Sequence, residues 1–213
     1  MKNLTSILQH VSLKSSAVVS SIVFLYSASQ SGVCAEDPHA HHRHMAESQK
    51  SLVRSLAHYV VPTVNLIDSD GKESRLTEII SSKKPVMLNF IFTTCTAICP
   101  IMSASFAQVS KQIGAEDKEL QLISISVDPE QDTPAKLKEY AKLFNSGSQW
   151  QLFTGTLGNS IEVQKAFDAY RGDKMNHLPF TFIRGANSNV WVRLEGLASA
   201  NELIQELKTL PFK

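Results

Sequence analysis

The chain has 213 residues, of which 43% are apolar and 19% charged, and its formal net charge is +1. This length and composition fit one globular domain plus a tail. Lys and Arg number 21 and Asp and Glu 20, so no basic field is present to attract nucleic acid. Three cysteines are too few for a small disulfide scaffold, so we expect apolar side chains to build the core.

Residues 1–35 have the pattern of a secretory signal peptide. Two lysines flank an uncharged stretch whose apolar centre runs over 17–26, and small residues precede Ala35 as at a cleavage site. Cleavage after Ala35 would remove Cys34 with the leader. The alternative is an uncleaved anchor, but the apolar centre is much shorter than the roughly 20 residues that a spanning helix needs. We therefore expect a periplasmic or otherwise exported protein, with membrane contact only if the leader stays attached.

A histidine tract follows the leader. Four of the seven histidines of the chain lie between His39 and His44. Such a tract either collects metal ions loosely or is a solvated linker without a ligand role. A short helix is expected over 47–57. We interpret residues 36–58 as a His-rich tail or linker and residues 59–213 as the folded domain.

Strands and helices alternate through this domain. The apolar run 85–92 is typical of a strand buried on both faces of a sheet, and Thr133 and Pro134 suit the start of a helix. Alternation that ends in a hairpin and a helix predicts an α/β sandwich with a central mixed sheet flanked by helices. In chain order we expect a strand at 63–67, a helix at 76–82, a strand at 85–92, a helix at 101–113, a strand at 120–127, a helix at 134–144 with Leu137, Tyr140, Leu143 and Phe144 on its apolar face, a strand at 150–153, a helix at 161–170, strands at 180–183 and 190–194, and a helix at 200–210.

Cys95 and Cys99 stand where the buried strand ends and a helix begins. Such a turn presents backbone N–H groups and the positive end of the helix dipole, which lower a thiol pKa. The alternative is that both cysteines are small core residues without a chemical role, because free cysteine is commonly buried. A pair within five residues of an exported chain favours reactive thiols.

The spacing of the two cysteines bears on their chemistry. Side chains four apart on a regular helix have Cβ atoms about 5 to 6 Å apart, whereas a disulfide needs about 3.8 Å. A disulfide would require Cys95 to lie off the helix or the first turn to distort. Thiolates favour Cu(I), and an added imidazole broadens the choice to Cu(II) or Zn(II). The spacing favours metal binding over disulfide catalysis and leaves thiol chemistry open.

Two histidines outside the leader and the tail are candidates for a third ligand. His58 precedes the first core strand and is most simply a surface residue. His177 precedes the strand at 180–183, which we expect beside the strand at 85–92. A lone histidine is more often structural, but this position favours a ligand role. Met175 is either a softer neighbouring donor or a packing residue.

Three ordered signatures resemble the SCO/SenC family over Tyr59 to Leu210. They are the Cys-x-x-x-Cys-Pro motif, the segment Ser124 to Pro134 with its Asp-Pro and Asp-Thr-Pro elements, and a single distant histidine. The resemblance implies a thioredoxin-like fold. It also implies copper held by Cys95, Cys99 and His177, and delivery of copper to, or maintenance of the thiols of, a copper site in respiratory cytochrome c oxidase.

The resemblance also concerns Asp128, and the sequence departs from known patterns near His177. Asp128 would lie beside the site or simply fix the turn at Pro129. Asn176 replaces the aspartate that precedes the histidine in the family and cannot supply its charge. The segment Leu178-Pro179 is similar to the proline-led strand of thioredoxins, where a cis proline faces the redox pair.

We interpret the protein as a metallochaperone more than a catalyst. Its expected partners are the copper-site subunit of the oxidase and a protein that keeps Cys95 and Cys99 reduced. The alternative is a thiol-disulfide oxidoreductase acting on cysteines of an oxidase subunit, with the same two residues as its catalytic pair. A redoxin-like peroxidase fits less well, because the Pro and Thr of a peroxide-binding loop are not placed ahead of Cys95.

Overall fold

One mixed sheet organises the chain in the computed structural model, which describes residues 52–81, 83–113 and 120–210. The expected signal peptide, Cys34 and the histidine tract lie outside these residues. Within them, eight strands follow the order β1-β8-β7-β4-β5-β6-β2-β3. The elements are β1 (Val53–His58), β2 (Asn65–Asp68), β3 (Glu73–Arg75), α2 (Leu76–Ile79), β4 (Val86–Ile91), α3 (Ile98–Ile113), β5 (Gln121–Ser126), α4 (Pro134–Leu143), β6 (Trp150–Thr154), α5 (Leu157–Ala166), the 3-10 turn η1 (Lys174–Asn176), β7 (Phe180–Arg184), β8 (Val190–Glu195) and α6 (Ala200–Lys208).

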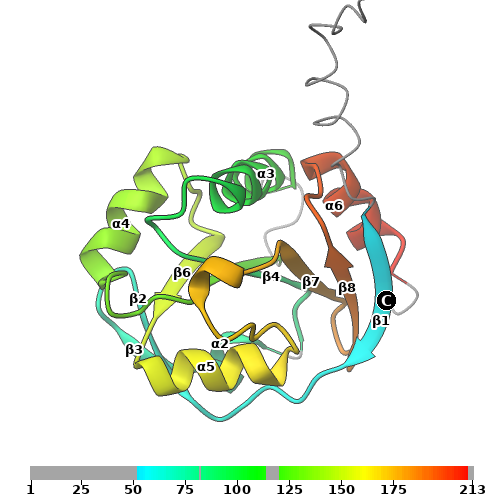
Figure 1. Ribbon diagram of the computed structural model, residues 1–213. Coiled ribbons are helices and arrows are strands. Elements are labelled where there is room, and N and C mark those ends of the chain that lie inside the picture. The colour runs from blue at the N-terminus through cyan, green and yellow to red at the C-terminus, as the bar shows by residue number, and fades with distance from the viewer. Residues whose placement is uncertain (1–51, 82, 114–119, 211–213) are drawn as a thin grey trace, which may run out of the picture. The chain divides into compact units, whose positions relative to one another are not determined.

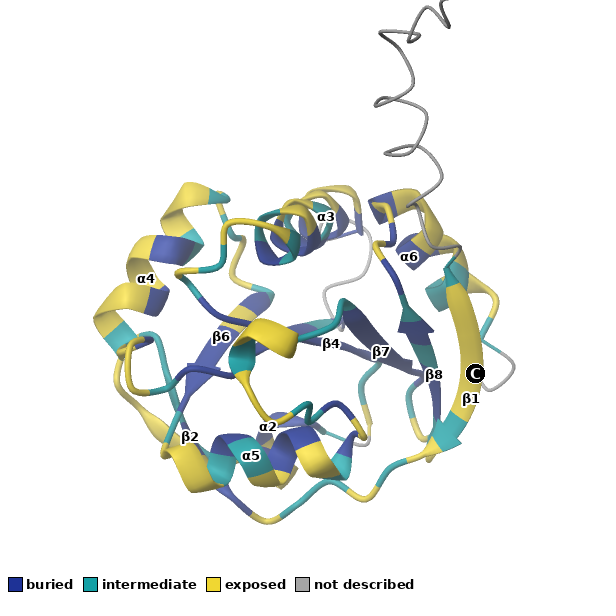
Figure 2. Cartoon of the chain, in the orientation of Figure 1, coloured by how far each residue is buried: buried dark blue, intermediate teal, exposed yellow. Residues whose placement is uncertain are grey.

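Helices cover both faces of this sheet. Figure 1 shows α3, α4 and α6 on one face and α2 and α5 on the other. Every residue of β4 is buried, and the buried positions of the helices turn toward the sheet in Figure 2. A strand enclosed on two sides needs apolar side chains at successive positions, and β4 is apolar except for Asn89, whose side-chain oxygen accepts from the Ser124 hydroxyl at 2.6 Å. The predicted α/β sandwich with a mixed sheet is confirmed.

Local sequence signals place several helix starts. The Thr133 hydroxyl accepts a hydrogen bond from the Lys136 N–H at 3.4 Å, and Pro134 occupies the first turn of α4, as predicted. Ser199 and Glu202 form a capping box at the start of α6. Of the apolar face expected on α4, Leu137, Tyr140 and Phe144 pack against the core, whereas Leu143 is 76% exposed and was wrongly included.

Three elements differ from the sequence prediction. Val53–His58 is a strand that pairs antiparallel with β8, so the helix expected over 47–57 is wrong in its described part and the sheet starts before residue 59. Cross-strand pairing, which local sequence does not report, decides this segment. β3 was not predicted. α5 begins at Leu157 because the Thr156 hydroxyl accepts from the Asn159 N–H at 3.1 Å, and it ends before Asp168, whose φ is +51°.

The sheet order brings three chain segments to one edge. β4 and β5 are parallel neighbours, so the loops that follow them leave from the same edge. β7 lies beside β4, as expected for the strand after His177, and the pairing is antiparallel, so the segment before β7 arrives at that edge. The cysteine loop, the Asp128 to Asp132 loop and η1 therefore meet there.

Candidate metal and thiol site

The two cysteines occupy different positions at the start of α3. Cys95 lies in a turn ahead of the helix, where its N–H donates to the Phe92 carbonyl at 3.2 Å. Cys99 lies in the first turn of α3 and its N–H donates to the Cys95 sulfur at 3.5 Å. Both thiols are free. Because Cys95 lies off the helix, the spacing of a regular helix does not limit the approach of the two sulfurs.

This placement gives the two thiols opposite acidities. Burial raises the pKa of Cys95, but hydrogen bonds from the backbone N–H groups of Cys99, Ala97 and Ile98 outweigh it and hold that pKa below the usual value. Burial strongly raises the pKa of Cys99, which is fully enclosed. Cys95 is therefore the thiol that ionises and reacts first.

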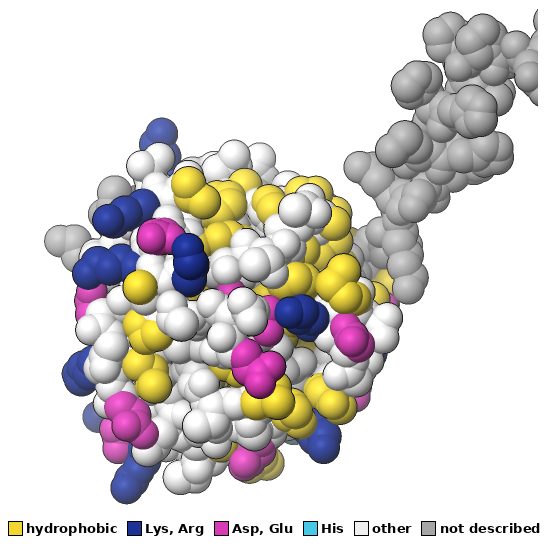
Figure 3. Space-filling model, turned by 60° about the vertical axis from the view of Figure 1, so that its left-hand side comes forward, with side chains coloured by type: hydrophobic (Ala, Val, Ile, Leu, Met, Phe, Trp, Pro, Cys, Tyr) yellow, Lys and Arg dark blue, Asp and Glu magenta, His cyan; other side chains and the backbone are white. Residues whose placement is uncertain are grey.

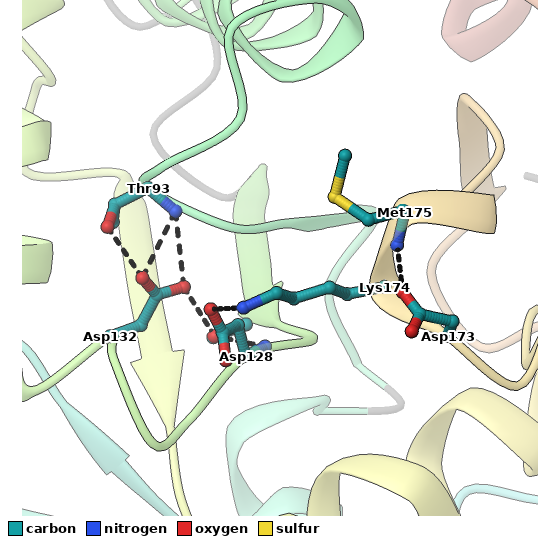
Figure 4. A network of polar contacts seen from close by, with 7 residues as sticks. Thr93, Asp128, Asp132, Asp173, Lys174 and Met175 are labelled. Atoms are coloured by element: carbon teal, nitrogen blue, oxygen red, sulfur yellow. Dashed lines mark hydrogen bonds and ion pairs between the residues drawn. The ribbon is translucent and has the colours of Figure 1, made fainter.

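A buried carboxylate fixes the start of the cysteine loop. Asp132 is fully buried. Its carboxylate accepts from the Thr93 N–H at 3.1 Å and from the Thr93 hydroxyl at 2.6 Å, and the Ser126 hydroxyl donates to its other oxygen at 2.6 Å. Figure 4 shows Asp132 reaching across to Thr93. The loop after β5 thus holds the loop after β4 in place.

A second contact ties η1 to the same region. The Lys174 ammonium lies 2.6 Å from the Asp128 carboxylate, which is 7% exposed. The Asp128 carbonyl also accepts from the N–H groups of Gln131 and Asp132, so Asp128 both shapes its turn and contacts the loop that leads to His177. In Figure 4 this ion pair joins the β5 loop to η1.

His177 follows η1 with a mostly buried side chain. Burial lowers the pKa of His177 to about 4, although a hydrogen bond with the Phe90 backbone opposes the shift. The imidazole is therefore neutral at pH 7, the form that binds metals. Its Nε2 atom is buried without a hydrogen-bond partner among the described residues. A buried nitrogen with a free lone pair is costly unless it binds something.

A cavity of about 250 Å³ connects these elements. Cys95, His177 and Met175 line it together with Phe92 and Lys174, whereas the enclosed Cys99 does not. Among the described residues, no group of three His, Cys, Asp or Glu side chains is arranged to hold a metal ion. The structure thus brings Cys95 and His177 to one cavity, while the Cys99 thiol is fully enclosed and hydrogen-bonded to the Cys95 thiol.

The other residues singled out in the sequence lie as follows. His58 is exposed at the end of β1 and does not line the cavity. Asn176 is exposed at the end of η1. No peptide bond in the described segments is cis, so the likeness of Leu178-Pro179 to thioredoxins does not extend to that bond.

Sequence reasoning missed two residues of this region. The sequence places Asp132 in the Ser124 to Pro134 segment and ahead of a helix start without indicating a role for it, and it indicates no role for Lys174. The signal available for Asp132 was its place two residues beyond Glu130 in a loop that follows a buried strand. That signal does not separate a buried carboxylate from an exposed one.

Comparisons with known proteins place the chain in a family. The SCO1/SenC family matches residues 55–211. The SCO1 protein homolog of Bacillus subtilis is 30% identical over 168 residues, which are 74% of this chain and 86% of that protein. A Stutzerimonas stutzeri protein described as copper-binding is 32% identical over 106 residues, 49% of this chain and 48% of its own.

The fold comparison gives the same family. The solved structure of BsSco, a member of the Sco family of cytochrome c oxidase assembly proteins, is 27% identical, has a TM-score of 0.61 and covers 74% of this chain and 96% of the solved one. The thioredoxin-like fold expected from the sequence is confirmed. No helix within the described segments is long and apolar enough to span a membrane.

Replacement of Asp132 tests the support of the cysteine loop. Asp132→Asn keeps the shape but sets an NH₂ group against donors from Thr93 or Ser126, so we expect the free energy of unfolding to fall by roughly 1 to 3 kcal/mol. Urea denaturation measures this. Glu130→Gln, an exposed change in the same loop, is the control. Equal stability of the two variants would contradict the role given to Asp132.

The buried imidazole predicts a pH dependence of stability. The pKa of His177 is about 4 in the folded chain, against about 6.5 when unfolded. Between these values the unfolded chain binds more protons, so the free energy of unfolding should fall as pH drops from about 6.5 to about 4, by up to roughly 3 kcal/mol. Urea denaturation of the reduced, metal-free protein across this range should show a shallower slope for His177→Gln, and an unchanged slope is the opposing result.

Proposed function

Because the chain belongs to the SCO1/SenC family, we propose that it is an exported copper-binding protein that delivers copper to, or maintains the thiols of, a cytochrome c oxidase copper site. The proposed copper ligands are Cys95, Cys99 and His177. The observation that carries the proposal is the cavity shared by the acidic Cys95 thiol and the His177 imidazole, whose Nε2 has no partner in the described part of the chain.

The chemistry of these residues fits copper. Thiolate sulfur is the donor that Cu(I) prefers, and a neutral imidazole suits Cu(I), Cu(II) and Zn(II). The relatives support this choice, because the Stutzerimonas stutzeri protein is described as copper-binding and BsSco belongs to a family of cytochrome c oxidase assembly proteins. Copper is the cargo of such a protein and is not consumed or transformed by it.

The geometry also suits release. Cys95 stands in a turn beside the open cavity, so an acceptor's thiolate can approach the bound ion from solvent and replace Cys95 as a ligand. Cys99 is enclosed and its thiol is hydrogen-bonded to that of Cys95, so it can remain a ligand while Cys95 is exchanged. Partial exposure of one ligand and burial of the other allow stepwise exchange.

Export rests on the pattern of residues 1–35. A positively flanked apolar centre followed by small residues is the signature of a cleaved leader. The mass of the chain isolated from cells is the check. A chain that begins at Glu36 supports the proposal, and one that retains Met1 in the cytoplasmic fraction opposes it.

Copper content tests the proposed ligands. We expect the reduced protein to retain close to one copper per chain after gel filtration, Cys95→Ser to lose it, and His177→Ala to bind at least about tenfold more weakly. His58→Ala, an exposed histidine that does not line the cavity, is the matched control. A variant with alanine at the four histidines between His39 and His44 separates copper bound by the tail from copper bound by the domain. Full copper retention in His177→Ala would exclude that ligand.

One observation favours thiol-disulfide exchange as the alternative function. Cys95 has a lowered pKa and faces the cavity, while Cys99 is enclosed with a raised pKa. In such an exchange the Cys95 thiolate attacks a partner disulfide and releases one partner thiolate. Cys99 then loses its proton and attacks the Cys95 sulfur, releasing the second thiolate. The partner disulfide gains two electrons, and Cys95 and Cys99 become a disulfide. BsSco has a disulfide switch.

Reduction of a synthetic peptide with one disulfide separates the two functions. If the thiol pair acts alone, the rate should be lost in Cys95→Ser, unchanged in His177→Ala and insensitive to a copper chelator. We expect this pattern if the protein maintains oxidase thiols. The absence of reduction by the wild-type dithiol form would leave copper delivery as the supported role.

A further inference from the structure

Met175 is an exposed apolar residue that does not pack in the core and is not one of the three proposed ligands. Its side chain is 75% exposed, although methionine is a residue that fills cores. It lines the cavity that Cys95 and His177 line. Figure 3 shows that apolar side chains gather on one face of the domain, and Ile101 is another exposed apolar residue near the start of α3.

The backbone that carries Met175 is held by polar contacts. The Met175 N–H donates to the Asp173 carboxylate at 2.7 Å, and the neighbouring Lys174 pairs with Asp128. In Figure 4 the Met175 side chain points away from the Lys174 and Asp128 pair. Polar anchoring of η1 therefore holds the thioether at the cavity without apolar packing.

The remaining cavity groups do not compete as soft donors. The Lys174 ammonium has no lone pair, and the hydroxyls of Thr94 and Thr96 are hard donors. Phe92, Ala97 and Ile98 contribute only apolar surface. The side chains on this wall that can offer sulfur or imidazole nitrogen are Cys95, Met175 and His177.

We propose that Cys95, Met175 and His177 form a capture site for Cu(I), with two sulfurs and one imidazole nitrogen, which receives the ion before Cys99 joins. This rests on the proposed copper-binding function. The Cys95 thiol gives its proton to solvent as its sulfur binds, and the ion keeps its oxidation state. Cys99 joins afterwards from its place beside Cys95, because its thiol is enclosed in the unloaded fold and hydrogen-bonded to the Cys95 thiol.

A thioether makes the site selective for the reduced ion. Thioether sulfur is a soft, uncharged donor that suits Cu(I). Asn176 carries no carboxylate, and the Asp173 carboxylate of the same turn already accepts from the Met175 N–H. Loss of Met175 should therefore weaken Cu(I) binding more than Cu(II) binding.

The test uses the full chain, reduced, with Cu(I) supplied in a bicinchoninate buffer. All proteins carry Cys34→Ser and alanine at the four histidines between His39 and His44, so that the measured affinity belongs to the domain. Three are compared: Cys99→Ala, Cys99→Ala with Met175→Leu, and Cys99→Ala with Met102→Leu. Met102 is 4% exposed on α3 and does not line the cavity, so it is the matched control.

We expect Cys99→Ala to retain Cu(I), the Met175→Leu double variant to bind at least about tenfold more weakly, and the Met102→Leu double variant to match Cys99→Ala. X-ray absorption should count two sulfur neighbours for the ion in Cys99→Ala and one after Met175→Leu. Equal affinities and equal sulfur counts would overturn the capture site.

Two further results separate this proposal from the function it rests on. The parent protein carries Cys34→Ser and the four alanine replacements but keeps Cys99. If this parent binds no Cu(I), copper binding itself is refuted. A parent that binds while both Cys99→Ala and Cys99→Ser, folded by circular dichroism, do not bind refutes only the capture site.

Discussion

The arrangement of the site depends on one buried charge, the carboxylate of Asp132. A carboxylate removed from water is stable only if hydrogen bonds replace its hydration, and here Thr93 and Ser126 provide three donors. Two of those donors belong to the residue that opens the cysteine loop. The contacts that stabilise the buried charge therefore also position the loop that carries Cys95. They fix the loops after β4 and β5 relative to each other.

With that loop fixed, the start of α3 decides the character of the thiols. The same N–H groups that α3 leaves unpaired at its first turn reach the sulfur of Cys95, which precedes the helix. Cys99 is one turn further on and is enclosed by the core. A difference of four residues in sequence thus becomes a difference between an acidic, accessible thiol and a protonated, enclosed one.

The side of the cavity opposite the cysteines comes from η1, which is short and polar. Its position depends on the Lys174 and Asp128 pair and on the Asp173 carboxylate. His177 is neutral because the core encloses it. Because the Asp128 carboxylate is buried beside the site, its ion pair with Lys174 ties η1 to the loop after β5.

The sequence by itself determined the α/β alternation and the capped start of α4, because apolar periodicity and capping residues are local properties. Motif spacing and a family resemblance singled out Cys95, Cys99 and His177 only as candidate site residues. The sequence did not determine that Val53–His58 is an edge strand, since that depends on hydrogen bonds to β8. Only the tertiary structure decided that Cys95 is accessible and Cys99 enclosed, that Asp132 is a buried anchor, and that Met175 shares a cavity with Cys95. Burial and contact between distant segments follow from the order of strands in the sheet, which no local pattern records.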